Sequence, residues 1–405
     1  MGPVMHRLLL VLTLLGLFTA SASRPNPALD GKLCTLPLSL AKAQAQTETS
    51  TSGQVRVYYI GAVKLRWDYA PSGRNLISNI ALNQDPEAAV FTAPGPERIG
   101  RTYWKARYVE FTDATFTKTK AEADPEYRVR WKHLGMLGPI IHAEVGDEVH
   151  IVFKNLTPKA DNLALSVHMH GLEYDKDAEG APYGGRDNPG DRVLPGQTYT
   201  YLYKVPESAG PGPMDPSSVV WMYHSHVDEV ADTYAGLIGA AVVSAKGKAK
   251  PDGSPADVDR EFFTLYHVFN ENLSPYLPQN LKPLRKKPAE GDEAFEESNL
   301  MHSINGYVYG NLPGLEMAVG ERVRWYALGM GTEVDLHTPH WHGQTVLYNG
   351  MRMDMLELLP GSMKVADMVP RTAGTWLLHC HVNDHIKAGM SALFVVKPEA
   401  PGTGQ

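Results

Sequence analysis

The chain of 405 residues has only two cysteines, Cys34 and Cys380, so no network of disulfides can hold its fold together. It also lacks an excess of positive charge. Its 38 basic and 45 acidic residues give a formal charge of -7, which argues against nucleic acid and anionic membrane surfaces as partners. Beyond residue 23, no apolar run approaches the roughly 20 residues of a membrane span. The 43% apolar content is enough for a packed core.

The N-terminus predicts export. Residues 1–23 contain a basic residue, an apolar run and an Ala-Ser-Ala cleavage signal, which is typical of a secretory signal peptide. We therefore expect a secreted, extracellular protein. Residues 24–53 are rich in Ala, Ser, Thr and Gln without periodicity and predict a disordered lead-in. Asn155 and Asn272 begin glycosylation sequons, which we expect on the surface if they are used.

The rest of the sequence predicts an all-β fold. Short β-rich runs such as 55–60, 148–153 and 198–203 alternate with Gly, Pro and Asn/Asp turns, which is typical of β-sandwiches or barrels.

An internal repeat divides this part of the chain. Residues 143–149 (AEVGDEV) are echoed by residues 317–323 (MAVGERV), and each copy precedes an H-x-H-G motif. The polar stretch between the copies predicts a linker. We expect domain 1 at 54–246, a linker at 247–260 and domain 2 at 261–398.

The segment from His379 to Met390 concentrates soft metal ligands. Two histidines, a cysteine and a distant axial methionine form the ligand set of a blue-copper electron-transfer site, and Cys380, His385 and Met390 could supply three of these ligands. Met390 could also be a core residue, but its place after the other ligands favours axial ligation. His379 and His381 flank Cys380 on an expected strand, so their side chains point to the opposite face and must serve something behind the blue site.

Histidine pairs extend this pattern. Ten of the sixteen histidines fall in four clusters, and an H-x-H pair on a strand places two imidazoles on one face, about 7 Å apart. His337 can complete the blue site, after which eight histidines remain in four pairs, two from each domain. That number fits three coppers held across a domain interface. In domain 1, Ser225 and Leu237 stand where domain 2 has Cys380 and Met390, so domain 1 should hold no blue copper.

These motifs resemble those of the multicopper oxidases, whose HxH, HxH, HxxHxH and HCHxxxHxxxxM patterns are all present. The resemblance implies two cupredoxin-like Greek-key domains and four coppers per chain. It implies a relay in which Cys380 passes electrons to His379 and His381. It assigns His168 and His340 to the type 2 copper. It assigns the type 3 pair to the remaining histidines, namely His170, His224, His226, His342, His379 and His381.

Stretches outside the ligands, such as residues 134–141 and 329–337, resemble the ceruloplasmin and hephaestin branch of that family. This resemblance implies Fe(II) and dioxygen as substrates. Members of that branch have six such domains, whereas this sequence has two. We therefore expect a homotrimer with closed head-to-tail interfaces, in which neighbouring subunits share the trinuclear cluster. The implied iron ligands are Glu297, His302 and Asp384, with Glu333 as a fourth that could come from a neighbouring subunit.

Other functions stay open on the sequence alone. The chain could be a laccase-like oxidase of phenols or aromatic amines, or a non-catalytic copper-binding module. A copper nitrite reductase would need a blue site in the first domain and only three interface histidines, so the eight histidines argue against it. Taken singly, Glu297 or Asp384 could be an ordinary surface acid.

Overall fold

The computed structural model describes residues 53–185 and 188–399. The chain divides into two units, Met1–Ser50 and Thr51–Gln405, and the fold described here is that of the second. The predicted signal peptide, nearly all of the predicted lead-in and Cys34 lie outside the described residues. Within the described ranges, no helix is long and apolar enough to cross a lipid bilayer.

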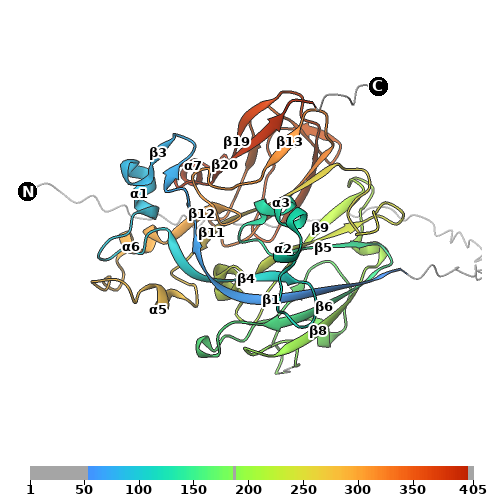
Figure 1. Ribbon diagram of the computed structural model, residues 1–405, viewed down its shortest axis with the longest axis horizontal. Coiled ribbons are helices and arrows are strands. Elements are labelled where there is room, and N and C mark those ends of the chain that lie inside the picture. The colour runs from blue at the N-terminus through green and yellow to red at the C-terminus, as the bar shows by residue number, and fades with distance from the viewer. Residues whose placement is uncertain (1–52, 186–187, 400–405) are drawn as a thin grey trace, which may run out of the picture. The chain divides into compact units, whose positions relative to one another are not determined.

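Two four-stranded sheets form from residues before 245 (Figure 1). The strands of the first, in spatial order, are β4 (Thr102–Phe111), β1 (Val55–Asp68), β6 (Glu148–Asn155) and β8 (Thr198–Lys204). Those of the second are β5 (Ile140–Glu144), β10 (Ile238–Ser244), β9 (Ser218–His224) and β7 (His168–Met169). The strands predicted at 55–60, 148–153 and 198–203 are thus confirmed.

Two further sheets form from residues after 259. The six-stranded sheet consists of β12 (Leu300–Ile304), β11 (Arg260–Asn270), β14 (Val323–Gly329), β18 (Met363–Met368), β16 (Val346–Tyr348) and β17 (Met351–Met353). The four-stranded sheet consists of β13 (Glu316–Ala318), β20 (Ser391–Lys397), β19 (Gly374–Cys380) and β15 (Pro339–Trp341). A small hairpin pairs β2 (Arg74–Asn75) with β3 (Ile80–Ala81).

Strand pairing repeats between the two halves. β1 runs parallel to β6 as β11 does to β14, and β5 runs parallel to β10 as β13 does to β20. β9 pairs antiparallel with β10 and with β7, as β19 does with β20 and β15. Among the described strands, no pair joins the two halves. The last strand of the first half ends at Ser244 and the first strand of the second half begins at Arg260, and the sequence predicts a linker between them. The exact domain boundaries stay a prediction.

The helices are short and lie between strands. They are α1 (Pro86–Thr92), α2 (Lys120–Ala123), α3 (Pro125–Arg130), α4 (Glu229–Ala235), α5 (Leu277–Asn280), α6 (Glu293–Ser298) and α7 (Asn383–Lys387). Asp228 caps the N-terminus of helix α4, where its carboxylate accepts from the backbone N–H of Ala231, and Gly236 with φ 115° caps the C-terminus. A Cβ at Gly236 would collide with Met136, so only glycine lets the chain turn there into β10.

The two halves share one buried hydrophobic cluster, in which Met222 and Tyr234 pack together with Phe263 and Tyr326. A buried ion pair crosses the same boundary. The ammonium of Lys105 on β4 donates to Glu271, just after β11, and both side chains are fully buried. A charge buried in this way requires its partner, so the pair fixes how the halves meet.

The sequon at Asn155 does not lie on the surface as expected. Asn155 is fully buried at the end of β6, and its side-chain amide donates to the carbonyls of Leu163 and Val193 at 2.8 Å each. A glycan on that nitrogen would break both bonds and could not fit in the core. The Asn272 amide is half-buried and donates to the backbone carbonyl of Glu296 at 2.9 Å.

Candidate metal centres

The thiol of Cys380 and the imidazoles of His337 and His385 form one buried group, with ligand atoms within 4.8 Å of one another. Sγ of Cys380 lies 3.5 Å from Nδ1 of His385 and 3.9 Å from Nδ1 of His337, and the two Nδ1 atoms are 3.2 Å apart. Cys380 ends β19, His385 is on α7, and His337 precedes β15. The structure thus brings together three of the four residues predicted for a blue site.

The fourth predicted ligand, Met390, is fully buried in the same hydrophobic cluster as Cys380. The N–H of Cys380 donates to the Met390 carbonyl at 3.1 Å, which keeps the two residues side by side. Burial raises the pKa of the Cys380 thiol, and it lowers the pKa of His385 to about 4, with the neighbouring His337 adding to that effect. The imidazole is therefore neutral at pH 7 and can donate its lone pair to a metal.

Asp335, which no sequence pattern singles out, lies behind His337. Its Oδ1 is 3.3 Å from Nε2 of His337, opposite the Nδ1 that faces Cys380. Asp335 is almost fully buried. Although burial raises the pKa of this carboxyl, the neighbouring imidazoles of His267 and His337 hold it well below its usual range.

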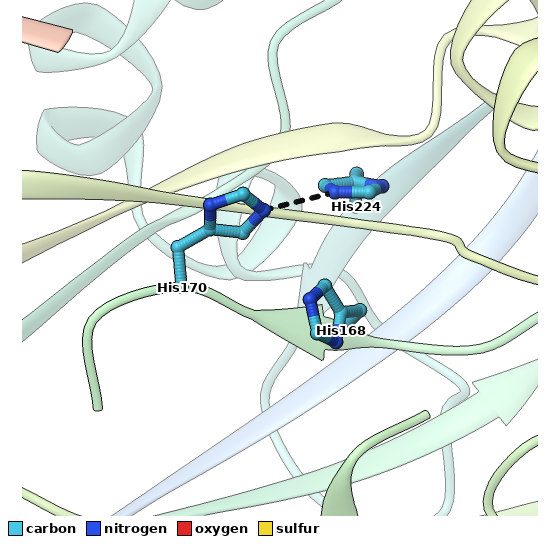
Figure 2. A group of neighbouring side chains, drawn as sticks. All are labelled: His168, His170 and His224. Atoms are coloured by element: carbon cyan, nitrogen blue, oxygen red, sulfur yellow. Dashed lines mark hydrogen bonds between the residues drawn. The ribbon is translucent and has the colours of Figure 1, made fainter. Parts of the chain in front are cut away.

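A second group lies in domain 1 and joins His168, His170 and His224 (Figure 2). Antiparallel pairing of β7 with β9 sets His168 opposite His224, and Nε2 of His170 is 3.0 Å from Nε2 of His224. The Nδ1 atoms of His168 and His224 contact the carbonyls of Glu179 and Ser225 at 2.8 and 3.1 Å. Because a carbonyl only accepts, each Nδ1 carries the proton and each Nε2 presents a lone pair.

A third group, in domain 2, repeats these contacts with His340, His342 and His379. Pairing of β15 with β19 sets His340 opposite His379, and Nε2 of His342 is 3.0 Å from Nε2 of His379. The Nδ1 atoms of His340 and His379 contact the carbonyls of Asp354 and Cys380 at 3.1 and 2.9 Å. The repeat seen in the sequence therefore extends to the tautomers of the imidazoles.

Each of these two groups has one more imidazole at its edge. The His226 ring is 5.0 Å from the His168 ring, and the His381 ring is 5.6 Å from the His340 ring. His226 is partly exposed and His381 is exposed, whereas His224 and His379 are buried. Burial, followed by the neighbouring imidazoles, lowers the pKa of His170 to about 4, so the ring is neutral at pH 7.

The two groups do not meet within the described part of the chain. Across residues 53–185 and 188–399, no hydrogen bond or ring contact joins an imidazole of domain 1 to one of the four at 340, 342, 379 and 381. Glu229, at the start of α4, is a further residue that no sequence pattern singles out. Its carboxylate lies 3.3 Å from Nε2 of His226 and 4.0 Å from Nε2 of His224.

Models of one protein family match both halves of the chain. The family described as multicopper oxidase matches residues 117–248 and again residues 273–400. The chain belongs to the multicopper oxidase family. The matched ranges contain all ten clustered histidines and Cys380, and membership in this family implies copper as the cofactor.

Curated relatives within the multicopper oxidases are much longer than this chain. Rat hephaestin (Rattus norvegicus) is 41% identical over 353 residues, which are 85% of this chain and 30% of that protein. Human ceruloplasmin (Homo sapiens) is 40% identical over 84% of this chain and 30% of its own length. Ferroxidase HEPHL1 of Homo sapiens is 40% identical over 83% and 29%. The chain thus spans about 30% of the length of these relatives.

Solved multicopper oxidase structures share the fold. The multicopper oxidase mgLAC aligns with a TM-score of 0.53 at 17% identity, over 85% of this chain and 86% of that one. The blue copper oxidase from Nitrosomonas europaea gives 0.51 at 16% identity, over 86% and 89%. The predicted all-β, cupredoxin-like fold is confirmed.

The donor sets fit copper. A buried thiol with two imidazole Nδ1 atoms matches the trigonal His₂Cys arrangement of blue sites, and imidazole Nε2 atoms 3.0 Å apart suit imidazole-bound copper. At the place in domain 1 that corresponds to the blue site, Ser225 donates to the carboxylate of Asp232 at 2.6 Å, and the N–H of Ser225 contacts the carbonyl of Leu237 as that of Cys380 contacts Met390. With a hydroxyl and an aliphatic side chain there, domain 1 has no blue ligand set.

The residues predicted to bind iron lie on β12, α6, α7 and the loop after β14. His302 on β12 lies 5.2 Å from the His385 ring, and Asp384 directly precedes His385 on α7. Glu297, at the end of α6, and Glu333 are both exposed. In the described residues these four do not form a group of three ligand atoms within 4.8 Å, so the structure brings His302 to the blue site but does not close an iron site within one chain.

Proposed function

We propose that the chain is a secreted multicopper ferroxidase that oxidises Fe(II) to Fe(III) and reduces dioxygen to water. The observation that carries this proposal is the arrangement of β19. Cys380 faces the group of His337 and His385, while the preceding residue, His379, faces His342 on the other side of the strand. One peptide unit thus connects the blue group, where electrons would enter, with the imidazole group of domain 2, which would supply half of the ligands of the dioxygen site.

In this proposal each chain would hold four coppers. The blue copper would be held by His337, Cys380, His385 and Met390. The type 2 copper would be held by His168 and His340, and the type 3 pair by the six remaining imidazoles. Copper supplies reversible one-electron storage when bound. The protein supplies neutral imidazoles, since burial lowers the pKa of His224 to about 3, and it fixes their orientation through backbone carbonyls.

For Fe(II) as the substrate, the support lies around His385. The Nδ1 of His302 contacts the carbonyl of Leu300 at 2.9 Å, which leaves its Nε2 lone pair free for a cation. Asp384 is an exposed carboxylate directly before a blue-site ligand. Anionic oxygen ligands stabilise the more highly charged Fe(III), so they favour loss of an electron from Fe(II). Glu297 would complete the acidic side of the site, and Glu333 would reach it from a neighbouring subunit.

We further propose a homotrimer in which the two imidazole groups of different subunits face each other. The groups do not touch within one chain, and His226 and His381 lie at their exposed edges, where each could reach the copper of the facing group. Because the chain spans about 30% of each relative, three copies come close to the length of one. Closed rings form when head-to-tail contacts repeat with a fitting rotation.

Copper content measured together with mass tests the assembly. Metal analysis and light scattering should give about four coppers per chain in a trimer, with intense blue absorption. A monomer carrying four coppers would contradict the shared cluster. A chain that binds copper but reduces no dioxygen would support the non-catalytic module instead.

Sequencing the N-terminus of the exported protein checks removal of residues 1–23.

Steady-state turnover of ferrous iron and of a phenol tests the substrate. The double change Glu297→Ala with His302→Ala should reduce iron oxidation at least tenfold and leave phenol oxidation nearly unchanged. Glu296→Ala is a matched control, because this exposed acid is on the same helix α6 and adjacent side chains on a helix do not face each other. If the double change leaves iron oxidation intact and phenol turnover dominates, the protein is a laccase-like oxidase.

A further inference from the structure

Backbone N–H groups hold the carboxylate of Asp335 in a fixed position. Asp335 lies in the loop between β14 and β15, and its Oδ1 accepts from the N–H of Val268 at 2.7 Å. Its Oδ2 accepts from the N–H of Thr332 at 2.9 Å. Gly331 has φ +126°, and a Cβ there would collide with this carboxylate. The loop therefore requires glycine in order to admit the acid.

The charge of Asp335 has no strong cation beside it. Within the described residues, its ion-pair partners are two imidazoles, His337 at 3.3 Å and His267 at 3.6 Å, and no lysine or arginine pairs with it. His267 is itself committed, because its Nδ1 contacts the Met330 carbonyl at 2.9 Å and its ring stacks on Tyr234. His337 is thus the imidazole that directs a ring N–H at this carboxylate.

We propose that Asp335 is a positioning residue that orients His337 and lowers the reduction potential of the blue copper. A carboxylate that accepts the second ring N–H of a ligand histidine fixes its tautomer and makes the imidazole a stronger donor. A buried negative charge also stabilises Cu(II) relative to Cu(I), because the attraction grows with the charge of the ion. This inference rests on the copper assignment proposed above and does not depend on iron being the substrate.

A redox titration of the blue absorption tests the proposal. Asp335→Asn keeps the size of the side chain and one acceptor oxygen but removes the charge. We expect the equilibrium between the oxidised and reduced forms to change about tenfold toward Cu(I), which corresponds to a rise of about 59 mV for one electron. Asp191→Asn is the matched control, since Asp191 is an almost fully buried aspartate of domain 1. The reduction potential of the blue copper in this variant should equal that of the wild type.

The outcomes separate cleanly. An unchanged potential in a blue Asp335→Asn protein overturns the inference and leaves the proposed function intact, whereas a wild-type protein without blue absorption refutes the copper assignment itself. A variant that folds but binds blue copper 10–100-fold more weakly supports the positioning role. If the variant binds too little copper for a titration, the tautomer of His337 can be measured in the copper-free protein. The ¹⁵N chemical shifts should place the His337 proton on Nε2 in the wild type, and a proton on Nδ1 would contradict the proposal.

Discussion

Acid should weaken the contact between the two halves of the fold at His133. This residue is fully buried in the 3-10 helix η2 (Lys132–Leu134), and its Nε2 accepts a hydrogen bond from the backbone N–H of Phe263 on β11 at 3.2 Å. The ring packs against Phe262 at 5.2 Å, and the amide of Asn305 donates to the His133 carbonyl at 2.6 Å. A proton on Nε2 would remove the acceptor and leave a charge in the core.

The magnitude follows from the pKa. Burial lowers the pKa of His133 to about 3, whereas a histidine in the unfolded chain titrates near 6.5. Because the folded value is the lower one, the contribution is complete above pH 6.5 and is lost as the pH falls toward 3. At about 1.36 kcal/mol for each pH unit, about 2 kcal/mol is lost by pH 5 and at most about 5 kcal/mol by pH 3. Domains are typically stable by only about 5–15 kcal/mol, so this loss is large.

Denaturant unfolding of the copper-free protein between pH 7.5 and 5 measures this effect. His133→Gln places a neutral acceptor near the position of Nε2 and cannot titrate. The wild type should lose about 2 kcal/mol more than the variant over this range. Other buried histidines titrate equally in both proteins, so the difference isolates His133. Parallel curves for the two proteins would refute the reasoning.

Three further outcomes are expected. Glu271→Gln leaves the buried ammonium of Lys105 without a counter-charge and should cost about 3–5 kcal/mol in denaturant unfolding, and adding Lys105→Met should recover part of this loss. Burial raises the pKa of Asp232 to about 6, so this acid is stabilising below its unfolded value near 3.9 and costs stability as the pH rises through 6. Asp232→Asn should therefore gain up to about 3 kcal/mol relative to the wild type between pH 4 and 7, and equal slopes would contradict this. Dilution followed by gel filtration should remove the coppers shared between subunits before the blue copper, which one domain holds alone.

The sequence predicted which histidines share a strand face, because the alternation of side chains along a strand determines it, whereas strand pairing brings the histidine pairs together. Alternation along β19 sends Cys380 to one face and His379 to the other, and no tertiary information is needed for that step. The repeated H-x-H motifs likewise predicted four histidine pairs, two from each domain. In the structure their equivalence reaches the carbonyls of Glu179 and Asp354, which fix the tautomers of His168 and His340.

Tertiary packing decided what the sequence could not predict. The sequon at Asn155 predicts a surface site, yet Asn155 lies in the core at the end of β6. Its side-chain amide donates hydrogen bonds to the carbonyls of Leu163 and Val193. Asp335 is two residues before His337 in an irregular loop, where no periodicity tells which way a side chain points. The acids at 297 and 384 come from different helices, so their separation depends on how α6 and α7 pack.

The division of ligands between the domains explains why one chain carries two unlike kinds of site. The blue group takes His337, Cys380 and His385 from one domain, so it can form as soon as that domain folds. The other imidazoles form two groups built by the same strand pairing, and each sets two Nε2 atoms 3.0 Å apart. Two such groups can share coppers only face to face, and within one chain they make no contact. Under the proposed function, electron entry would therefore need only one folded domain, whereas dioxygen reduction would need the assembly of subunits.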